Sequence, residues 1–259
     1  MVKKSGLILP VYVGLVLAFL VLPLVIVIAL SFSPSRFFVF PPSGVSLRWY
    51  VDLVSAPKWR EAAFNSLIVG LGASFVATAV GLLAAWGLSE AKSRWANVAT
   101  AWLVLPMGVP IVVVAVASFI TYSQYGLAST RLGLILAHAA LGLPFVTIAV
   151  TATLRGFNRN LVRAAESLGA SPFAAFRTVT IPVVMPGILT GAIFAFAVSF
   201  DEVIVALFQA TPQLHTLPVE IFSGTRESIT PTVTAAATVL MVISILLLVL
   251  VERLRKLSG

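Results

Sequence analysis

The sequence predicts an all-α membrane protein with six transmembrane helices, on three observations. Hydrophobic residues make up 59% of the 259 positions and charged residues only 10%, compared with roughly 25% charged residues in a typical soluble domain. Mean hydropathy is +1.07. The apolar residues are gathered into long runs separated by short polar segments, which is the pattern of a chain that crosses a bilayer several times.

Each of the apolar runs is long enough to cross a hydrocarbon core of about 30 Å at about 1.5 Å per residue. The predicted spans are residues 7–31, 64–88, 98–120, 132–154, 186–208 and 233–251. The first follows Lys3 and Lys4, and its apolar run of about 25 residues exceeds the roughly 7–15 of a signal peptide core. Cleavage near Ala29-Leu30-Ser31 stays open as an alternative.

The distribution of lysine and arginine predicts the orientation, because cytoplasmic loops carry an excess of both. One side of the predicted topology carries eleven basic residues and the other side six. We therefore expect both termini and the loop 155–185 in the cytoplasm. The eleven are Lys3, Lys4, Lys92, Arg94, Arg155, Arg159, Arg163, Arg177, Arg253, Arg255 and Lys256. The six are Arg36, Arg48, Lys58, Arg60, Arg131 and Arg226.

The net charge of +8 does not indicate nucleic-acid binding, because the basic residues are dispersed between the spans and do not form one basic surface. The chain has no cysteine, so disulfides and thiolate chemistry are excluded. The long external loop 33–63 carries Trp49, Tyr50 and Trp59, which fit an interfacial aromatic belt on a surface-lying connector. Direct contact of this loop with an external partner is the alternative.

Several polar and kink-forming residues have structural interpretations. Two histidines lack a partner at metal-ligand spacing, so no metal site is expected. A polar pair near the start of the second span is expected to cap or pack between helices, and three prolines are expected to bend helices. These residues are His138, His215, Asn65, Ser66, Pro106, Pro110 and Pro144.

Local rules predict two short helices in the polar stretch 158–182. Asn160 is a plausible N-cap for a first helix, Leu161–Leu168, and Gly169 supplies the left-handed residue that ends it. Ser171 and Pro172 are typical of the N-cap and N1 positions of a second helix.

This second helix is expected to run to about Thr180 and to end at Pro182, before Met185-Pro186-Gly187 begins the next span. The residues alone leave two interpretations open. One is a rigid loop that docks a partner protein, and the other is an amphipathic connector in the headgroup region.

The same stretch resembles the EAA loop of ABC importer permeases. The motif reads roughly Glu-Ala-Ala, three residues, Gly, nine residues, Ile-x-Leu-Pro. Here Arg163-Ala164-Ala165 is followed at the same spacing by Gly169 and Val179-Thr180-Ile181-Pro182. One position departs from the motif, because Arg163 stands where Glu is expected and Glu166 lies one turn further on.

The resemblance implies a type I ABC importer permease fold in a bacterial inner membrane. It further implies a coupling loop formed by Arg163, Ala164, Ala165, Glu166, Gly169, Ile181 and Pro182. The implied partners are a cytoplasmic ATP-binding subunit dimer, which would hold ATP and Mg²⁺, a second and paralogous permease, and an external solute-binding protein. The chain itself has no GxxxxGK[ST] phosphate loop, so no cofactor and no enzymatic activity are expected in it.

Asp201 and Glu202 are placed inside the predicted fifth span, with Asp201 14 residues past Gly187, or about 21 Å along a helix. Ionisable residues at such depth usually face a bundle interior or a water-filled path, so both are candidates for the translocation path. The alternatives are that they reach the outer headgroups or pair with Arg226.

The residues around this pair, Ser199–Val205 with Thr216–Val219 and Ile221–Ser223, resemble the second permease of spermidine/putrescine transporters. That resemblance implies a small organic solute, with a polyamine first and an aminophosphonate or amino-acid derivative as alternatives. A secondary transporter is the rival class, although it usually carries repeats and central ion-binding groups. A membrane-embedded enzyme would need a cluster of catalytic or metal-binding residues.

Overall fold

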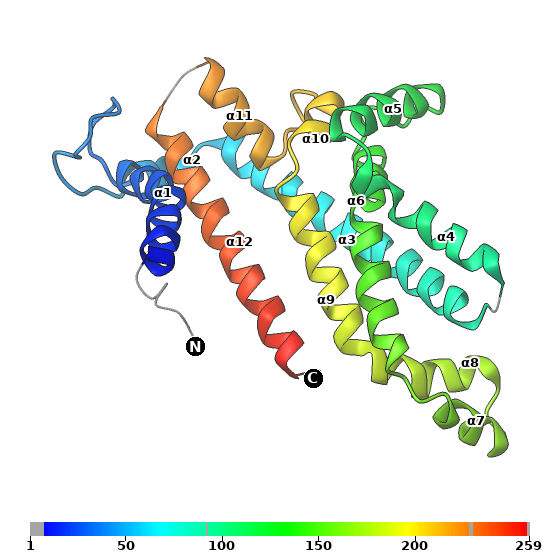
Figure 1. The fold of residues 1–259 in the computed structure, drawn as a ribbon. Helices are drawn as coiled ribbons and strands as arrows, with labels where there is room; N and C mark the ends of the chain where they lie inside the picture. Colours follow the sequence, from blue (N-terminus) through cyan, green and yellow to red (C-terminus); the bar gives the residue numbers. More distant parts are fainter. Residues whose placement is uncertain (1–7, 92, 228–229, 258–259) are drawn as a thin grey trace. The chain divides into compact units, whose positions relative to one another are not determined.

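The computed structural model describes residues 8–91, 93–227 and 230–257, and every regular element within these ranges is a helix (Figure 1). Residue 7, Lys3, Lys4 and Lys92, which entered the span and orientation predictions, lie outside the described residues. The helices are α1 (Ile8–Ser31), α2 (Arg48–Ser55), α3 (Pro57–Glu90), α4 (Arg94–Val104), η1 (Leu105–Gly108), α5 (Ile111–Gln124), α6 (Arg131–Arg155), α7 (Asn160–Ser167), α8 (Pro172–Ala175), η2 (Phe176–Thr180), α9 (Ile181–Phe200), α10 (Ile204–Gln209), α11 (Leu217–Glu227) and α12 (Pro231–Leu257).

The all-helical membrane fold is confirmed, with corrections to two of the predicted spans, 98–120 and 186–208. Five helical stretches in the described residues are long and apolar enough to cross a bilayer, and they correspond to five of the six predicted spans. The predicted span 98–120 is not one helix. It is divided into α4–η1 and α5, which meet at 105°.

Two prolines explain the break. Pro106 lies in the first turn of η1 and Pro110 immediately precedes α5, while Val109 between them is extended. A proline disfavours the helical conformation in the residue before it, so the helix cannot continue through Val109. Pro144, by contrast, lies inside the continuous helix α6.

The chain divides into two compact units, and each is described by itself. Unit 1 comprises residues 1–60 and 220–242, and unit 2 comprises residues 61–219 and 243–259. Within unit 1, α1 exposes its apolar side chains from Leu9 to Val25. A helix of this kind lies against lipid or against another subunit.

Polar contacts connect α2 to the segments around it in unit 1. Trp49 Nε1 donates to the carbonyl oxygen of Ser33 at 2.6 Å, and Thr232 Oγ1 donates to Asp52 Oδ2 at 2.6 Å. Trp49 and Trp59 are only 7% and 2% exposed. The predicted aromatic belt is therefore wrong for these two rings, because they pack inside the unit.

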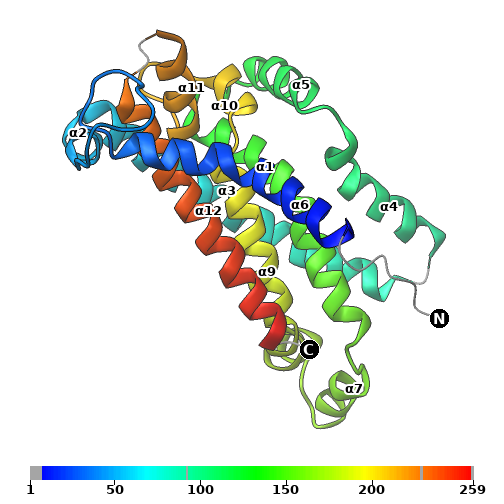
Figure 2. The same ribbon diagram turned by 60° about the vertical axis from the view of Figure 1, so that its left-hand side comes forward.

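Unit 2 is built around the helix pair α6–α9, which Figures 1 and 2 show side by side. Small residues allow the two backbones to approach closely. A Cβ atom added to Gly191 would lie 2.7 Å from Val146 Cα, and one added to Gly142 would lie 2.8 Å from Ala195 Cβ. Close approach at small residues is a usual way to pack membrane helices, where there is no hydrophobic driving force between them.

Candidate functional site: the two ends of the α6–α9 pair

Helices α7 and α8 lie at one end of the α6–α9 pair, and α10 lies at the other (Figure 1). Helix α7 ends in a closed cap. Gly169 has φ +91°, its N–H donates to Glu166 O at 2.9 Å, and the N–H of Ala170 donates to Ala165 O at 3.0 Å. These two bonds form a Schellman motif, which only a left-handed residue at Gly169 permits. The predicted role of Gly169 as the end of the helix is confirmed.

The start of α7 differs from the prediction by a small shift. Asn160 is the first residue of the helix, and its backbone N–H donates to Asn158 Oδ1 at 3.0 Å. The side-chain acceptor at this end is therefore Asn158. Both residues are asparagine, so the sequence pattern alone did not distinguish them.

The second helix begins as predicted but does not stop. Ser171 Oγ accepts the N–H of Ala174 at 3.2 Å, with Pro172 in the first turn. The helix then runs to Phe200 through a single π-turn, in which the N–H of Ile181 donates to Phe176 O. The predicted end at Pro182 is wrong. Proline has no N–H to donate to the preceding turn, and the wider π-turn before Pro182 lets the helix continue without that hydrogen bond.

The two faces of α7 have different surroundings. Arg163 and Glu166 line a cavity of about 320 Å³, together with Trp86 of α3 and Phe176 of η2. The Trp86 and Phe176 rings stack at 4.2 Å, and Arg159 donates to the carbonyl oxygen of Ser89, so the loop is fastened to the end of α3. Arg163 and Glu166 are both exposed and share the side of α7 that borders this cavity, which we call the inner face of the loop.

The other face carries large apolar side chains that the sequence analysis missed. Leu168 is 90% exposed, Phe173 71% and Leu161 47%, and Ala164 between the two leucines is also exposed. The spacing of Leu161, Ala164 and Leu168 places them on one side of α7. We call Leu161, Ala164, Leu168 and Phe173 the outer apolar face of the loop. The i, i+3, i+7 spacing in the sequence was the available signal.

At the opposite end, α9 terminates earlier than predicted. It ends at Phe200, Asp201 follows as its C-cap, and Glu202 stands between α9 and α10. The predicted span 186–208 therefore extends too far, and the acidic pair lies at a helix break. The cause is Glu202, whose side chain accepts the N–H groups of Ile204 and Val205 on Oε1 and of Ala206 on Oε2, at 2.7–2.9 Å.

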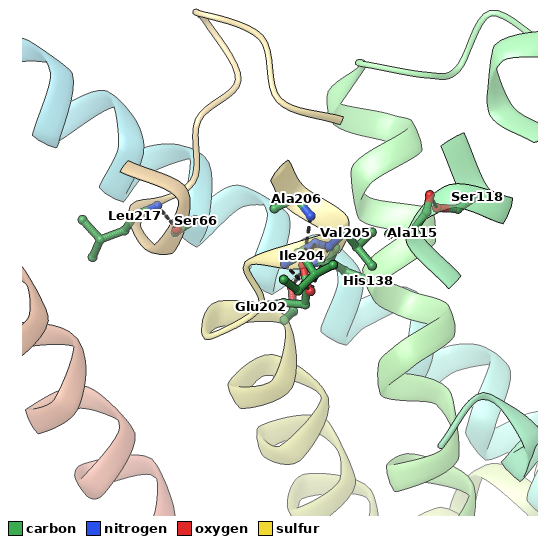
Figure 3. A network of polar contacts seen from close by, with 10 residues as sticks. Ser66, Ala115, Ser118, His138, Glu202, Ile204, Val205, Ala206 and Leu217 are labelled. Atoms are coloured by element: carbon green, nitrogen blue, oxygen red, sulfur yellow. Dashed lines mark hydrogen bonds and ion pairs between the residues drawn. The ribbon is translucent and has the colours of Figure 1, made fainter. Parts of the chain in front are cut away.

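Glu202 also faces a buried histidine (Figure 3). His138 of α6 is fully buried, its Nε2 lies 3.5 Å from Glu202 Oε2, and its Nδ1 shares a 2.8 Å hydrogen bond with Ser199 Oγ. Glu202 itself is 7% exposed. It is thus a capping residue held by α6, and the structural role expected for His138 is the one it has.

Two residues of α3 hold the segment that follows α10. Asn65 Nδ2 donates to the carbonyl oxygens of Gln213 and His215 at 3.1 and 3.0 Å, and its Oδ1 accepts from Arg131. Ser66 Oγ accepts the N–H of Leu217 at 2.7 Å (Figure 3). The expected packing role of Asn65 and Ser66 takes this form: their side chains bind main chain about 150 residues away.

Two of the hollows on the surface of unit 2 lie along α9. We call the hollow at the Asp201 end of α9 the outer hollow and the one nearer the loop the inner hollow. The outer hollow has a volume of about 650 Å³, is lined mostly by apolar side chains of α9 and the C-terminal half of α12, and includes Asp201 and Glu202. The inner hollow, also of about 650 Å³, lies between α6 and α9 and includes Thr153 and Thr190. Asp201 is exposed, unlike its neighbour Glu202. The arrangement offers a cation one accessible carboxylate in apolar surroundings.

A helical membrane protein with hollows along one helix pair and an exposed helical loop at its end has the organisation of a transport subunit. Comparison with known proteins identifies the class. Residues 77–257 match the family described as "Binding-protein-dependent transport system inner membrane component". The chain belongs to this family of ABC importer permeases.

Relatives and solved structures agree with this assignment. The chain is 31% identical to the spermidine/putrescine permease PotC of Haemophilus influenzae, over 92% of this chain and 93% of that protein. It is 30% identical to the putrescine permease PotI of Escherichia coli, over 86% and 82%. A subunit of a bacterial ABC transporter for alginate import has the same fold, with a TM-score of 0.72, 16% identity and coverage of 99% and 98%.

Proposed function

We propose that this permease imports a polyamine, or a closely similar organic cation, through a path that includes Asp201. The observation that carries the proposal is the position of Asp201, an exposed carboxylate in a hollow lined mostly by apolar side chains. A charge in such surroundings is costly unless it has an ionic partner. The names of the relatives PotC and PotI point to the same class of solute.

Glu202 is proposed to act on the structure of the path rather than on the solute. Its two oxygens already accept three backbone N–H groups, and His138 faces it. This leaves little capacity for a further cation. Of the two carboxylates predicted to line the path, Asp201 is therefore the one available to bind.

The loop at the other end is proposed to dock a separate ATP-binding subunit. Exposed large apolar side chains on a polar loop are typical of an interaction site, and the outer apolar face presents Leu168 and Phe173 almost fully. Gly169 and the Schellman motif fix the angle at which α7 is presented. The loop joins α6 directly to α9, so a displacement of the docked loop reaches both helices.

Arg163 stands where the motif has Glu, and this difference in charge bears on how the loop docks. Arg163 and Glu166 lie on the inner face and line the same cavity, so docking is proposed to depend first on the apolar face. Glu166 is in the position to supply the carboxylate that Arg163 replaces. The coupling residues Ala165, Ile181 and Pro182 are proposed to support the loop, since Ala165 accepts the closing hydrogen bond of α7.

The complete assembly is proposed to contain this permease, a paralogous permease, two ATP-binding subunits and an external solute-binding protein. One solved alginate transporter of the same fold was crystallised with a periplasmic protein bound. The excess of Lys and Arg in the loops on one side supports cytoplasmic termini and a cytoplasmic loop 155–185. ATP and Mg²⁺ are then held by the partner subunits.

The test is purification and reconstitution of the complex. A tagged permease should bring down an ATP-binding subunit in stoichiometric amount, and proteoliposomes of the complex should take up labelled spermidine or putrescine only with ATP and the binding protein. Uptake by the permease alone, driven by an ion gradient, would instead identify a secondary transporter. ATP-driven uptake of an aminophosphonate or amino-acid derivative, but not of polyamines, would overturn the solute while leaving the importer class intact.

A further inference from the structure

Phe194 in the outer half of α9 lines both the outer and the inner hollow. Its ring stacks on that of Phe145 in α6, with 6.1 Å between centroids and an interplanar angle of 24°. Both rings are half-buried. A solute that moves along this surface from one hollow to the other must therefore pass the Phe194 ring.

We infer that Phe194 is a specificity-determining residue of the translocation path, at which an organic ammonium group crosses between the hollows over the ring face. This inference rests on the proposed import of an organic cation. Phe145 is the supporting ring that holds Phe194 in place. We call the pair the aromatic septum.

The positions of Asp201 and Phe194 fit successive contacts with one cation. Phe194 lies within α9, and Asp201, seven residues later, is the C-cap of this helix. The two residues therefore lie on the same face of the helix, about 10 Å apart along its axis. A cation that leaves the Asp201 carboxylate in apolar surroundings needs another favourable contact. The negative face of an aromatic ring supplies one without a counter-charge, so the cation is not trapped there.

The same ring discriminates against other solutes. A phenylalanine offers no hydrogen-bond donor or acceptor, and its face repels an anion for the reason that it attracts a cation. Below the septum, the hydroxyl groups of Thr153 and Thr190 line the inner hollow and provide hydrogen-bond acceptors for an ammonium group. The septum thus separates a site with a carboxylate from a site with hydroxyls.

The lack of native cysteine makes the path directly testable. In the complete transporter, Phe194→Cys and Ala197→Cys should react with a water-soluble cationic thiol reagent, and spermidine should slow the reaction. Ala197 lines the outer hollow. The matched control is Tyr125→Cys at the end of α5, where the ring is 73% exposed and lines neither hollow; spermidine should leave its reaction rate unchanged. Phe75 of α3, 75% exposed, also lines neither hollow and is the control for transport.

The role of the ring is tested by transport. Phe194→Leu should lower kcat/KM for spermidine uptake by about tenfold, as expected for a partly desolvated cation–π contact, and Phe194→Tyr should restore most of it. Phe75→Leu should match the wild type. Leucine fills a similar volume, and a thermal midpoint within a few degrees of the wild type checks that the fold is kept.

The outcomes separate the two proposals. If the wild-type complex shows no ATP-dependent polyamine uptake, the proposed function fails and the inference fails with it. If the wild type transports but Phe194→Leu transports equally well, or if Phe194→Cys shows no protection by spermidine, the septum is overturned and the proposed function stands. Loss of transport in Phe194→Leu, rescue by Phe194→Tyr and protection of Phe194→Cys together support it.

Discussion

The two ends of the α6–α9 pair are built in different ways. The loop 156–180 takes its shape from short-range contacts, among them the Schellman bonds at Gly169 and the Ser171 cap. It is attached to α3 through Trp86 and Ser89, and it leaves large apolar side chains exposed. The outer end is made of long-range polar contacts that are buried, such as His138 to Glu202 and Asn65 to the 213–215 main chain. The exposed end is suited to binding another protein, and the buried end to holding a fixed shape.

Replacement of Glu202 should have the largest effect on stability. Glu202→Leu removes the acceptor of three N–H groups and the neighbour of His138. Because a buried N–H group without an acceptor costs about 1–3 kcal/mol, we expect a total loss of about 3 kcal/mol or more. The thermal midpoint of the purified complex in detergent measures the loss. Asp201→Leu is the matched control, and it should change stability by less than about 0.5 kcal/mol. Equal losses in both variants would contradict the distinction between the two carboxylates.

Replacement of Leu168 should affect assembly rather than stability. Leu168→Asp puts a charge into the outer apolar face, where loss of a central contact costs about 2 kcal/mol of binding free energy, or about 30-fold in affinity for the ATP-binding subunit. Co-purification yield and transport-coupled ATP hydrolysis measure the effect. Thr178→Asp, at another exposed position of the same loop, should retain binding. Normal assembly of Leu168→Asp would remove the docking role from this face.

Neutralising Asp201 should weaken transport by a smaller factor. Asp201→Asn keeps the shape of the side chain but removes its charge, and we expect kcat/KM for a polyamine to fall about tenfold, or about 1.4 kcal/mol. Initial rates of labelled spermidine uptake measure this. Asp201→Glu retains the charge and should keep most of the activity. An unchanged rate in Asp201→Asn would take Asp201 out of the path.

The smallest expected effect is that of Gly169→Ala. Alanine at a left-handed position costs about 1 kcal/mol, so Gly169→Ala should lower the coupling of ATP hydrolysis to uptake by a few-fold, and Gly169→Pro should abolish it because proline cannot adopt φ +91°. Gly126→Ala is the control, since Gly126 also has a positive φ, +67°. It carries a similar local strain but lies outside the loop, so coupling should be normal there. Equal uncoupling by both variants would point to general destabilisation.

The contrast between the two ends also explains what the sequence could predict. The Gly169 turn, the Ser171 cap and four of the spans follow from residues within a few positions of each other, and local signals of that kind are readable in one sequence. The helix break at Asp201 is set by Glu202 together with His138, 64 positions earlier in the chain. The sequence contains both residues, but hydropathy gives no sign that they meet.

Two further errors share one cause. Both errors concern the effect of a proline on a helix. One is the predicted helix end at Pro182, and the other is the predicted single span 98–120. Pro182 is accommodated by a π-turn, whereas Pro106 and Pro110 break the chain direction by 105°. The difference depends on the packing around each proline, which spacing alone does not contain. The motif predicts the coupling residues, whereas the exposure of Leu168 and Phe173 is seen only in the structure.

The close approach of α6 and α9 has a mechanical consequence. At Gly142 and Gly191 there is no room for even a methyl group between the two helices. Sliding one helix along the other would bring larger side chains into these contacts, so we expect such sliding to be disfavoured. We therefore expect residues 181–194 to move together with α6. If the loop docks the ATP-binding subunit as proposed, its displacement would be carried along α9 to the rings of Phe145 and Phe194.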